Sequence, residues 1–126
     1  MVSGSGSAGL TATSTTYAAP AAGTAATTSV TVSGSHSAIV TLSAVCSNSN
    51  NGRGCHMSVT LSGATTLAAD DTRAVLISAD SANVNESSSF SFVTTLNDGT
   101  TTFTAQYKVM NNTGTWAASN IIVQVY

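Results

Sequence analysis

Histidine is the side chain that most often acts as a general base near neutral pH, and this sequence contains two of them. His36 stands in a Gly-Ser-His-Ser turn, and His56 follows Cys55 directly at the start of an expected strand. Neighbouring side chains of a strand point to opposite faces, so His56 is poorly placed to activate the thiol of Cys55. Neither histidine lies beside a nucleophile-elbow motif. We therefore expect no catalytic residues and no enzymatic activity.

A metal site would have to combine Cys46 and Cys55 with the two histidines. A structural zinc site uses four such ligands, but Cys-x8-Cys-His matches none of the common spacings. Asp70 and Asp71 are the only close pair of carboxylates that could serve a glycosidase. They also lack the further oxygen ligands that a calcium loop supplies at regular spacing. We expect no metal site and no cofactor.

The two cysteines are better explained as a disulfide. Cys46 ends one expected strand and Cys55 begins the next, which should place them opposite each other in a hairpin. A bridge over so short a loop adds about 2 to 3 kcal/mol by restricting the unfolded chain. Two free thiols are the alternative, because the cytoplasm keeps cysteines reduced.

The composition excludes several classes of partner. The chain has 126 residues, which is enough for one domain; charged residues make up 6% of it, and the net charge is −2. Three cations cannot neutralise a phosphate backbone, so we expect no nucleic-acid binding. No stretch of about 20 apolar residues is present to span a membrane. The first residues have neither a basic region nor an apolar segment, so we expect no secretory signal.

Two segments of different composition divide the chain. Residues 1–28 are rich in Gly, Ser, Ala and Thr and contain the only proline, Pro20. Such a segment is disordered by itself, so we expect an extended arm that is held by the rest of an oligomer or by a neighbouring subunit. Residues 29–126 alternate apolar and polar side chains in short runs between turns. About eight strands without helical periodicity predict an all-β fold, a single jelly-roll-like antiparallel β-sandwich.

The end of the chain is apolar on both faces of its expected strand. Ile121 and Val123 lie on one face, whereas Ile122 and Tyr126 lie on the other. One face packs inside the sandwich, so we expect the other to contact a neighbouring chain in a homo-oligomer, with a trimer as the favoured state. Trp116 is a further candidate for this interface; the core and a sugar-stacking site are its alternatives.

The C-terminal half resembles a known family. It is similar to the small jelly-roll modules, of tumour-necrosis-factor-like architecture, that occur in structural proteins of tailed bacteriophages. The similar segments are Ser-Ser-Phe-Ser-Phe at 88–92, Leu-Asn-Asp-Gly-Thr at 96–100, Thr-Phe-Thr-Ala-Gln-Tyr-Lys-Val at 102–109, Gly-Thr at 114–115 and Asn-Ile-Ile-Val at 120–123, with 59–69 as a weaker match.

The resemblance implies a capsid decoration, or cement, protein. Such a protein is made in the host cytoplasm, binds the major capsid protein on the outer surface of the virion and stabilises the shell. Leu10, Tyr17 and Pro20 would then anchor the N-terminal arm on the capsid. The first alternative is a tail or head fibre module that contacts glycans of the host surface. A secreted surface-filament subunit is the second.

Overall fold

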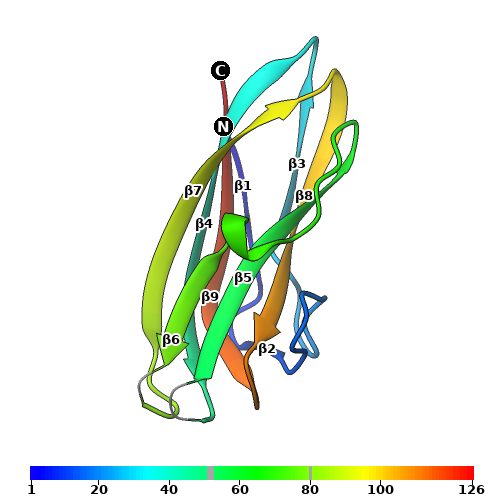
Figure 1. The fold of residues 1–126 in the computed structure, drawn as a ribbon. Helices are drawn as coiled ribbons and strands as arrows, with labels where there is room; N and C mark the ends of the chain where they lie inside the picture. The colour runs from blue at the N-terminus through cyan, green and yellow to red at the C-terminus, as the bar shows by residue number, and fades with distance from the viewer. Residues whose placement is uncertain (51–52, 80) are drawn as a thin grey trace.

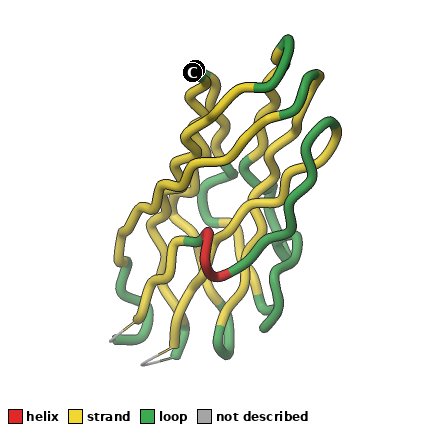
Figure 2. The backbone as a smooth tube through the Cα atoms, turned by 45° about the horizontal axis from the view of Figure 1, so that its top comes forward, coloured by secondary structure: helices red, strands yellow, loops and turns green. Residues whose placement is uncertain are grey.

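The computed structural model of the protein describes residues 1–50, 53–79 and 81–126, and most of these lie in β-strands. The described residues include one helical turn, which is drawn in red in Figure 2. None of the described helices is long and apolar enough to cross a membrane. The elements are β1 (Val2–Ser5), β2 (Leu10–Ala12), β3 (Thr27–Val32), β4 (His36–Asn48), β5 (Arg53–Gly63), the 3-10 turn η1 (Asp71–Arg73), β6 (Val75–Ala79), β7 (Glu86–Leu96), β8 (Gly99–Val109) and β9 (Gly114–Val125).

The strands form two antiparallel sheets that pack face to face (Figure 1). Sheet A has the order β1-β9-β4-β7, with β2 also paired to β9, and sheet B has the order β3-β8-β5-β6. The pairs β1·β9, β3·β8, β4·β7 and β5·β6 are nested, as in a long hairpin that has been rolled up. This nesting is the arrangement of a jelly roll. The predicted all-β, jelly-roll-like sandwich is therefore confirmed, and β1 and β2 together form its first strand.

Alternating side chains decide which face of each strand enters the core. Along most of β4 and β8, every second residue is buried and the residues between them are partly exposed. Phe103, Tyr107 and Trp116 are the largest side chains that point inward, and each is fully buried. The rings of Tyr107 and Trp116 meet edge to face, with centroids 5.0 Å apart and an interplanar angle of 73°. This aromatic pair lies where the two sheets meet.

The hydroxyl of Tyr107 links the two sheets inside the core. It accepts a hydrogen bond from the backbone N–H of Ala26 at 3.1 Å and lies 2.9 Å from the hydroxyl of Ser119 on β9. Burial raises the pKa of Tyr107, so the phenol keeps its proton and can donate it to Ser119. A buried hydroxyl without partners would cost stability, and these two contacts remove that cost.

The N-terminal segment belongs to the sandwich, which corrects the expectation of a separate arm over residues 1–28. Both β1 and β2 pair with β9, and Leu10 lies opposite Trp116. Leu10 and Ala12 are each 1% exposed. Composition was misleading here because a strand at a sheet edge needs only backbone hydrogen bonds and a few small inward side chains. The segment is ordered by its own chain, so a neighbouring subunit is not needed to hold it.

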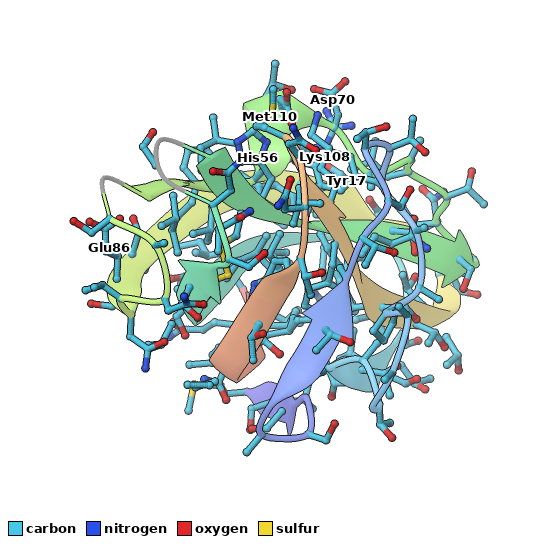
Figure 3. The ribbon with its side chains drawn as sticks, turned by 90° about the horizontal axis from the view of Figure 1, so that it is seen from below. Tyr17, His56, Asp70, Glu86, Lys108 and Met110 are labelled. Atoms are coloured by element: carbon cyan, nitrogen blue, oxygen red, sulfur yellow. A yellow bond between two sulfur atoms is a disulfide. The ribbon has the colours of Figure 1, made fainter. Side chains whose placement is uncertain are left out.

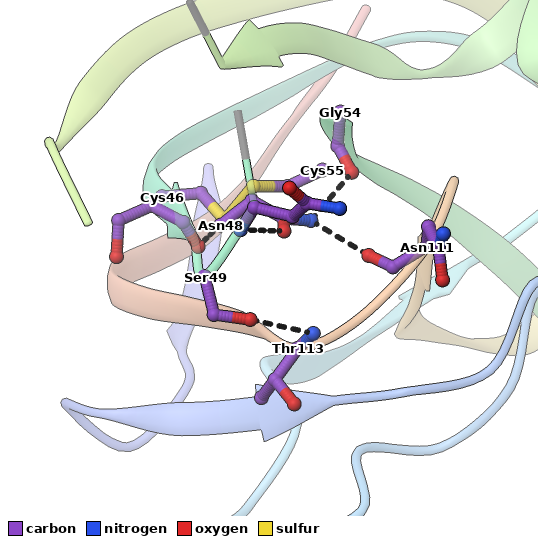
Figure 4. The surroundings of a disulfide bond; sticks show 9 residues. Cys46, Asn48, Ser49, Gly54, Cys55, Asn111 and Thr113 are labelled. Atoms are coloured by element: carbon purple, nitrogen blue, oxygen red, sulfur yellow. Dashed lines mark hydrogen bonds between the residues drawn. A yellow bond between two sulfur atoms is a disulfide. The ribbon is translucent and has the colours of Figure 1, made fainter. Parts of the chain in front are cut away.

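A disulfide joins Cys46 to Cys55, and it connects the two sheets (Figure 4). Cys46 lies on β4 of sheet A and Cys55 on β5 of sheet B, with their Cα atoms 6.5 Å apart. The expected hairpin is therefore wrong, because consecutive strands here belong to different layers. The two side chains meet because both point into the core, where each residue is at most 1% exposed.

Asn48 fastens the same end of the sandwich beside the disulfide (Figure 4). Its side-chain amide donates to the carbonyls of Gly54 at 3.3 Å and Asn111 at 3.1 Å, and its side-chain oxygen accepts from the N–H of Asn50 at 2.9 Å. Asn48 is fully buried, so these bonds satisfy a group that water cannot reach. Loops that follow strands of both sheets are held together in this way.

Replacing Cys46 and Cys55 together by alanine should lower the free energy of unfolding by about 2 to 3 kcal/mol, because the bridge restricts the unfolded chain. Urea denaturation followed by the fluorescence of Trp116 measures the change. In reducing agent, the wild-type protein should unfold at the same urea concentration as the variant. The urea midpoint of the variant should not change when reductant is added. Wild-type stability that does not respond to reductant would contradict the expectation.

Candidate functional site

Four polar side chains form a cluster on the outer face of sheet B, called here the Asp71 cluster: Tyr17, His56, Asp71 and Lys108. The Tyr17 hydroxyl donates to Asp71 Oδ1 at 2.6 Å, and Lys108 Nζ lies 3.0 Å from Oδ1 and 3.1 Å from Oδ2. His56 Nδ1 is 3.6 Å from Oδ1. Lys108 Nζ also lies 4.7 Å from the centre of the Tyr17 ring. Figure 3 shows Tyr17, His56 and Lys108 gathered on one side of the molecule.

The protonation states in the cluster follow from burial and hydrogen bonding. The bond from Tyr17, reinforced by Lys108, holds the pKa of Asp71 below its usual value. Burial, with Asp71 adding to it, raises the pKa of Tyr17, and burial lowers the pKa of His56. At neutral pH the carboxylate is charged, and the phenol and imidazole are neutral. Because the pKa of Asp71 is depressed in the folded chain, its contribution to stability exists above the unfolded pKa and is lost as pH falls through the folded one.

The cluster is arranged to hold chain segments together. Ser58 shares the outer face with His56, but its hydroxyl donates to the Arg73 carbonyl at 2.7 Å and accepts from the N–H of Asp70 at 3.1 Å. It is therefore engaged with backbone and not directed to His56 as a nucleophile would be. Within the described ranges, no three metal-ligating side chains come together. Through Tyr17, the cluster clamps the N-terminal segment onto η1 and β8.

The outer face of sheet A has the opposite character, and we call it the neutral face. The strand register places hydroxyl, amide and aliphatic side chains on it, and no charged one among the residues described. Hydroxyl pairs cross it, such as Thr41 with Ser91 at 2.8 Å. Its members are Ser3, Ser5, Ile39, Thr41, Ser43, Val45, Ser87, Ser89, Ser91, Val93, Ala118, Asn120, Ile122 and Gln124.

A shallow, open depression of about 320 Å³ lies on the neutral face across β7, β4 and β9. The hydroxyls of Ser43, Ser87 and Ser89 and the amide of Asn120 are part of its lining. Such a lining offers hydrogen-bond donors and acceptors without charge. It is suited to a neutral partner, and an ionic ligand would find no counter-ion there.

The three residues proposed for an oligomer interface lie in different places. Ile122, 37% exposed, is on the neutral face, and Tyr126, 63% exposed, follows the end of β9. Trp116 is 0% exposed, so its assignment to an interface was wrong and the core alternative is confirmed. The reason is register, because Trp116 takes an inward position opposite Leu10.

The residues proposed to anchor an arm on a capsid also need correction. Leu10 is buried in the chain's own core, and the hydroxyl of Tyr17 is already bonded to Asp71. Pro20 is partly exposed. Leu10 cannot reach another protein without unfolding the edge of sheet A.

Sequence reasoning missed the Asp71 cluster because it considered Asp70 and Asp71 only as a carboxylate pair for a glycosidase or a calcium loop. Two signals were present: Tyr17 is the one aromatic residue in 1–28, and Lys108 takes an outward position on its strand. The pairing of His56 with Lys108 depends on the register between β5 and β8, which sequence periodicity does not give.

Comparisons with known proteins show what the fold resembles. No protein-family model matches the sequence, and no curated protein matches it. The structure is similar to a chain from infectious bursal disease virus, Gt strain, with a TM-score of 0.61 and 14% identity. That match covers 97% of this chain but 32% of the viral one, so the chain spans about a third of that protein's length.

A second similar structure is a family 35 carbohydrate binding module from an environmental isolate. Its TM-score is 0.50 at 10% identity, and the match covers 100% of this chain and 93% of the module. At such identities the likeness establishes a shared fold and nothing about ligands or partners.

Replacing Tyr17 by phenylalanine should loosen the N-terminal segment. The change removes the bond to Asp71 and keeps the ring beneath Lys108, so we expect a loss of about 1 kcal/mol in the free energy of unfolding. Amide exchange should accelerate at Ala18, whose N–H bonds to the Tyr107 carbonyl at 3.2 Å. Tyr126→Phe, at an exposed residue, is the matched control and should change neither quantity. Equal effects of the two substitutions would rule out the clamp.

Proposed function

We propose that the chain is a structural protein of a virus particle, a capsid decoration protein that binds the outside of a phage head as a homo-oligomer and stabilises it. The role is non-catalytic and needs no cofactor. The observation that carries the proposal is the neutral face, a broad sheet surface that carries no charge over the part of the chain that the structure describes. The expected partners are other copies of the chain, three in the favoured assembly, and the major capsid protein.

Removing an uncharged sheet face from water costs little desolvation free energy. Hydroxyl and amide groups can exchange bonds to water for bonds to a partner, whereas each unpaired charge would add a large desolvation penalty. The apolar side chains of Ile39, Val93 and Ile122 add burial to this exchange. Interfaces are commonly depleted of charge at their centre, as this face is.

Two further features support a place on the outside of a particle. The disulfide between Cys46 and Cys55 persists only where conditions are oxidising, as they are at the surface of a released virion. The jelly roll is also a frequent fold of viral capsid domains, and the chain from infectious bursal disease virus shares it. The fold alone does not imply the role, so the proposal depends on the surface.

Glycan recognition by a fibre module is the second candidate. The hydroxyl-lined depression favours it, and so does a fold shared with a carbohydrate binding module. Stacking of a sugar on Trp116, however, is excluded by the burial of that ring. Tyr126 is the one aromatic side chain that is largely exposed within the described ranges, and it lies beyond the last strand.

Replacing Ile122 by lysine should break the oligomer at the neutral face. The substitution puts a charge at the centre of a surface that has none, so the mass measured by light scattering should fall threefold. Leu76→Lys is the matched control, because Leu76 is an exposed apolar residue, 51% accessible, on sheet B. The control should keep the wild-type mass. A wild-type protein with the mass of one chain would contradict the homo-oligomer.

The location on a particle is tested by cryo-electron microscopy of the particles whose genome encodes the chain. Density of the jelly roll should lie on the outer surface of the shell, and particles from a strain without the gene should lack it and release their genome at a lower temperature. Density confined to tail appendages would contradict decoration. In that case, specific binding of the purified protein to a glycan array would support the fibre module.

A further inference from the structure

β7 is the outermost strand of sheet A, and one of its edges is free. The sheet order ends at β7, which pairs with β4 along its other edge. Across the described ranges, no backbone group of residues 87–95 hydrogen-bonds to a segment other than β4. Figure 1 shows β7 along one margin of the sandwich. The free edge of a strand presents N–H and C=O groups that can pair with another chain.

The other margins of the sandwich are short or covered. β3 has six residues and β6 has five, whereas β7 has 11. At the opposite margin of sheet A, β1 has four residues, and the part near β2 is covered by its own chain, since Thr11 pairs with Ala22 and the N–H of Ser7 donates to the Thr24 carbonyl at 2.9 Å. Among the described strands, β7 therefore offers the longest open edge.

This edge lacks the features that normally prevent strands from pairing. Natural proteins protect edge strands with lysine or other charges, with proline or with bulges. The sequence of β7 is ESSSFSFVTTL, in which Glu86 at the first position is the one charge and proline is absent. Its register with β4 runs without a shift from Leu96 to Glu86, so no bulge turns the edge away.

The sequence of β7 is also complementary to itself. In an antiparallel pair centred on Ser91, Phe90 of one copy lies opposite Phe92 of the other, and Ser89 lies opposite Val93. Phe90 is 36% exposed and its ring centroid is 6.5 Å from that of Phe92, so a partner would add aromatic contacts at an uncovered rim. The two Glu86 carboxylates lie at opposite ends of the pair, about 34 Å apart at 3.4 Å per residue, and do not repel each other.

We propose that β7 pairs antiparallel with β7 of a second copy of the chain, centred on Ser91, so that sheet A continues across two subunits. The contact has two-fold symmetry and uses the same edge of both copies. Main-chain hydrogen bonds supply the attraction, and the two phenylalanines set the register. The proposal is independent of a role in a virus particle. It concerns an edge of sheet A, so it is compatible with a separate contact through the neutral face.

Cysteine cross-linking tests the register. Ser89→Cys and Val93→Cys, mixed under mild oxidation, should give a covalent dimer on a non-reducing gel, because opposite residues of paired strands are about 5 Å apart. Each variant alone should stay monomeric on the gel, since identical positions lie about 14 Å apart, four residues along the strand. Ser91→Cys should cross-link by itself. Absence of a dimer in both the mixture and Ser91→Cys would overturn the proposal, as would equal yields from Ser89→Cys alone and from the mixture.

Light scattering provides a second test that separates the edge from the neutral face. Phe90 points to the inner side of the sheet at its rim, so Phe90→Lys places a charge in the proposed pair and leaves the neutral face unchanged. Its mass should be half that of the wild type, a fall from six copies to three if the neutral face also forms trimers and from two copies to one if it does not. Val84→Lys, at a 51% exposed apolar residue before the strand, keeps the wild-type mass. Circular dichroism checks that both variants fold. An unchanged mass for folded Phe90→Lys would overturn the edge pairing, even if Ile122→Lys still dissociates the oligomer.

Discussion

The fold depends on the pairing of the first strand of the chain with the last. β1 and β2 lie along β9, and this contact brings Leu10 over Trp116 and closes sheet A at one margin. The aromatic pair of Trp116 and Tyr107 is fully buried only because that margin is closed. Few large side chains are available to this core. Backbone pairing, small inward residues and one disulfide therefore supply much of the stabilisation that larger cores obtain from leucine and phenylalanine.

The two outer faces of the sandwich carry different kinds of polar group. Sheet B carries the Asp71 cluster, in which a charged carboxylate, an ammonium and a phenol satisfy one another and hold the N-terminal segment. The neutral face has nothing comparable to protect it from a partner. A protein with so few charges would usually risk non-specific association. Here the uncharged surface is concentrated on one sheet and its edge, the two surfaces through which we propose that the chain associates.

Individual strands and turns could be predicted from the sequence, whereas contacts between residues far apart in the sequence could not. The alternation from Phe103 to Val109 and the glycine at 99, with its positive φ of 116°, specify a strand that begins at a turn. The cysteine pair could be proposed from spacing, but its position between layers could not, because β4 pairs with β7 and β9 instead of β5. Leu10 and Tyr17 were misjudged for the same reason: the partner of Leu10 is Trp116 and the partner of Tyr17 is Asp71, 54 residues away, and no local pattern reports such distant contacts.

The nested order of the roll also constrains how the chain can fold. The innermost pair, β5 and β6, is close in sequence and can form early, whereas β1 must wait for β9 at the other end of the chain. Non-local pairing of this kind is slow, since the loop between the partners must be closed before any contact compensates for the lost entropy. The residues of β1 are synthesised before those of β9, and they are thus among the last in this sandwich to reach their final pairing. Until β9 is complete, β4 has an open edge as well as β7, so the nascent chain exposes more strand edge than the finished molecule does.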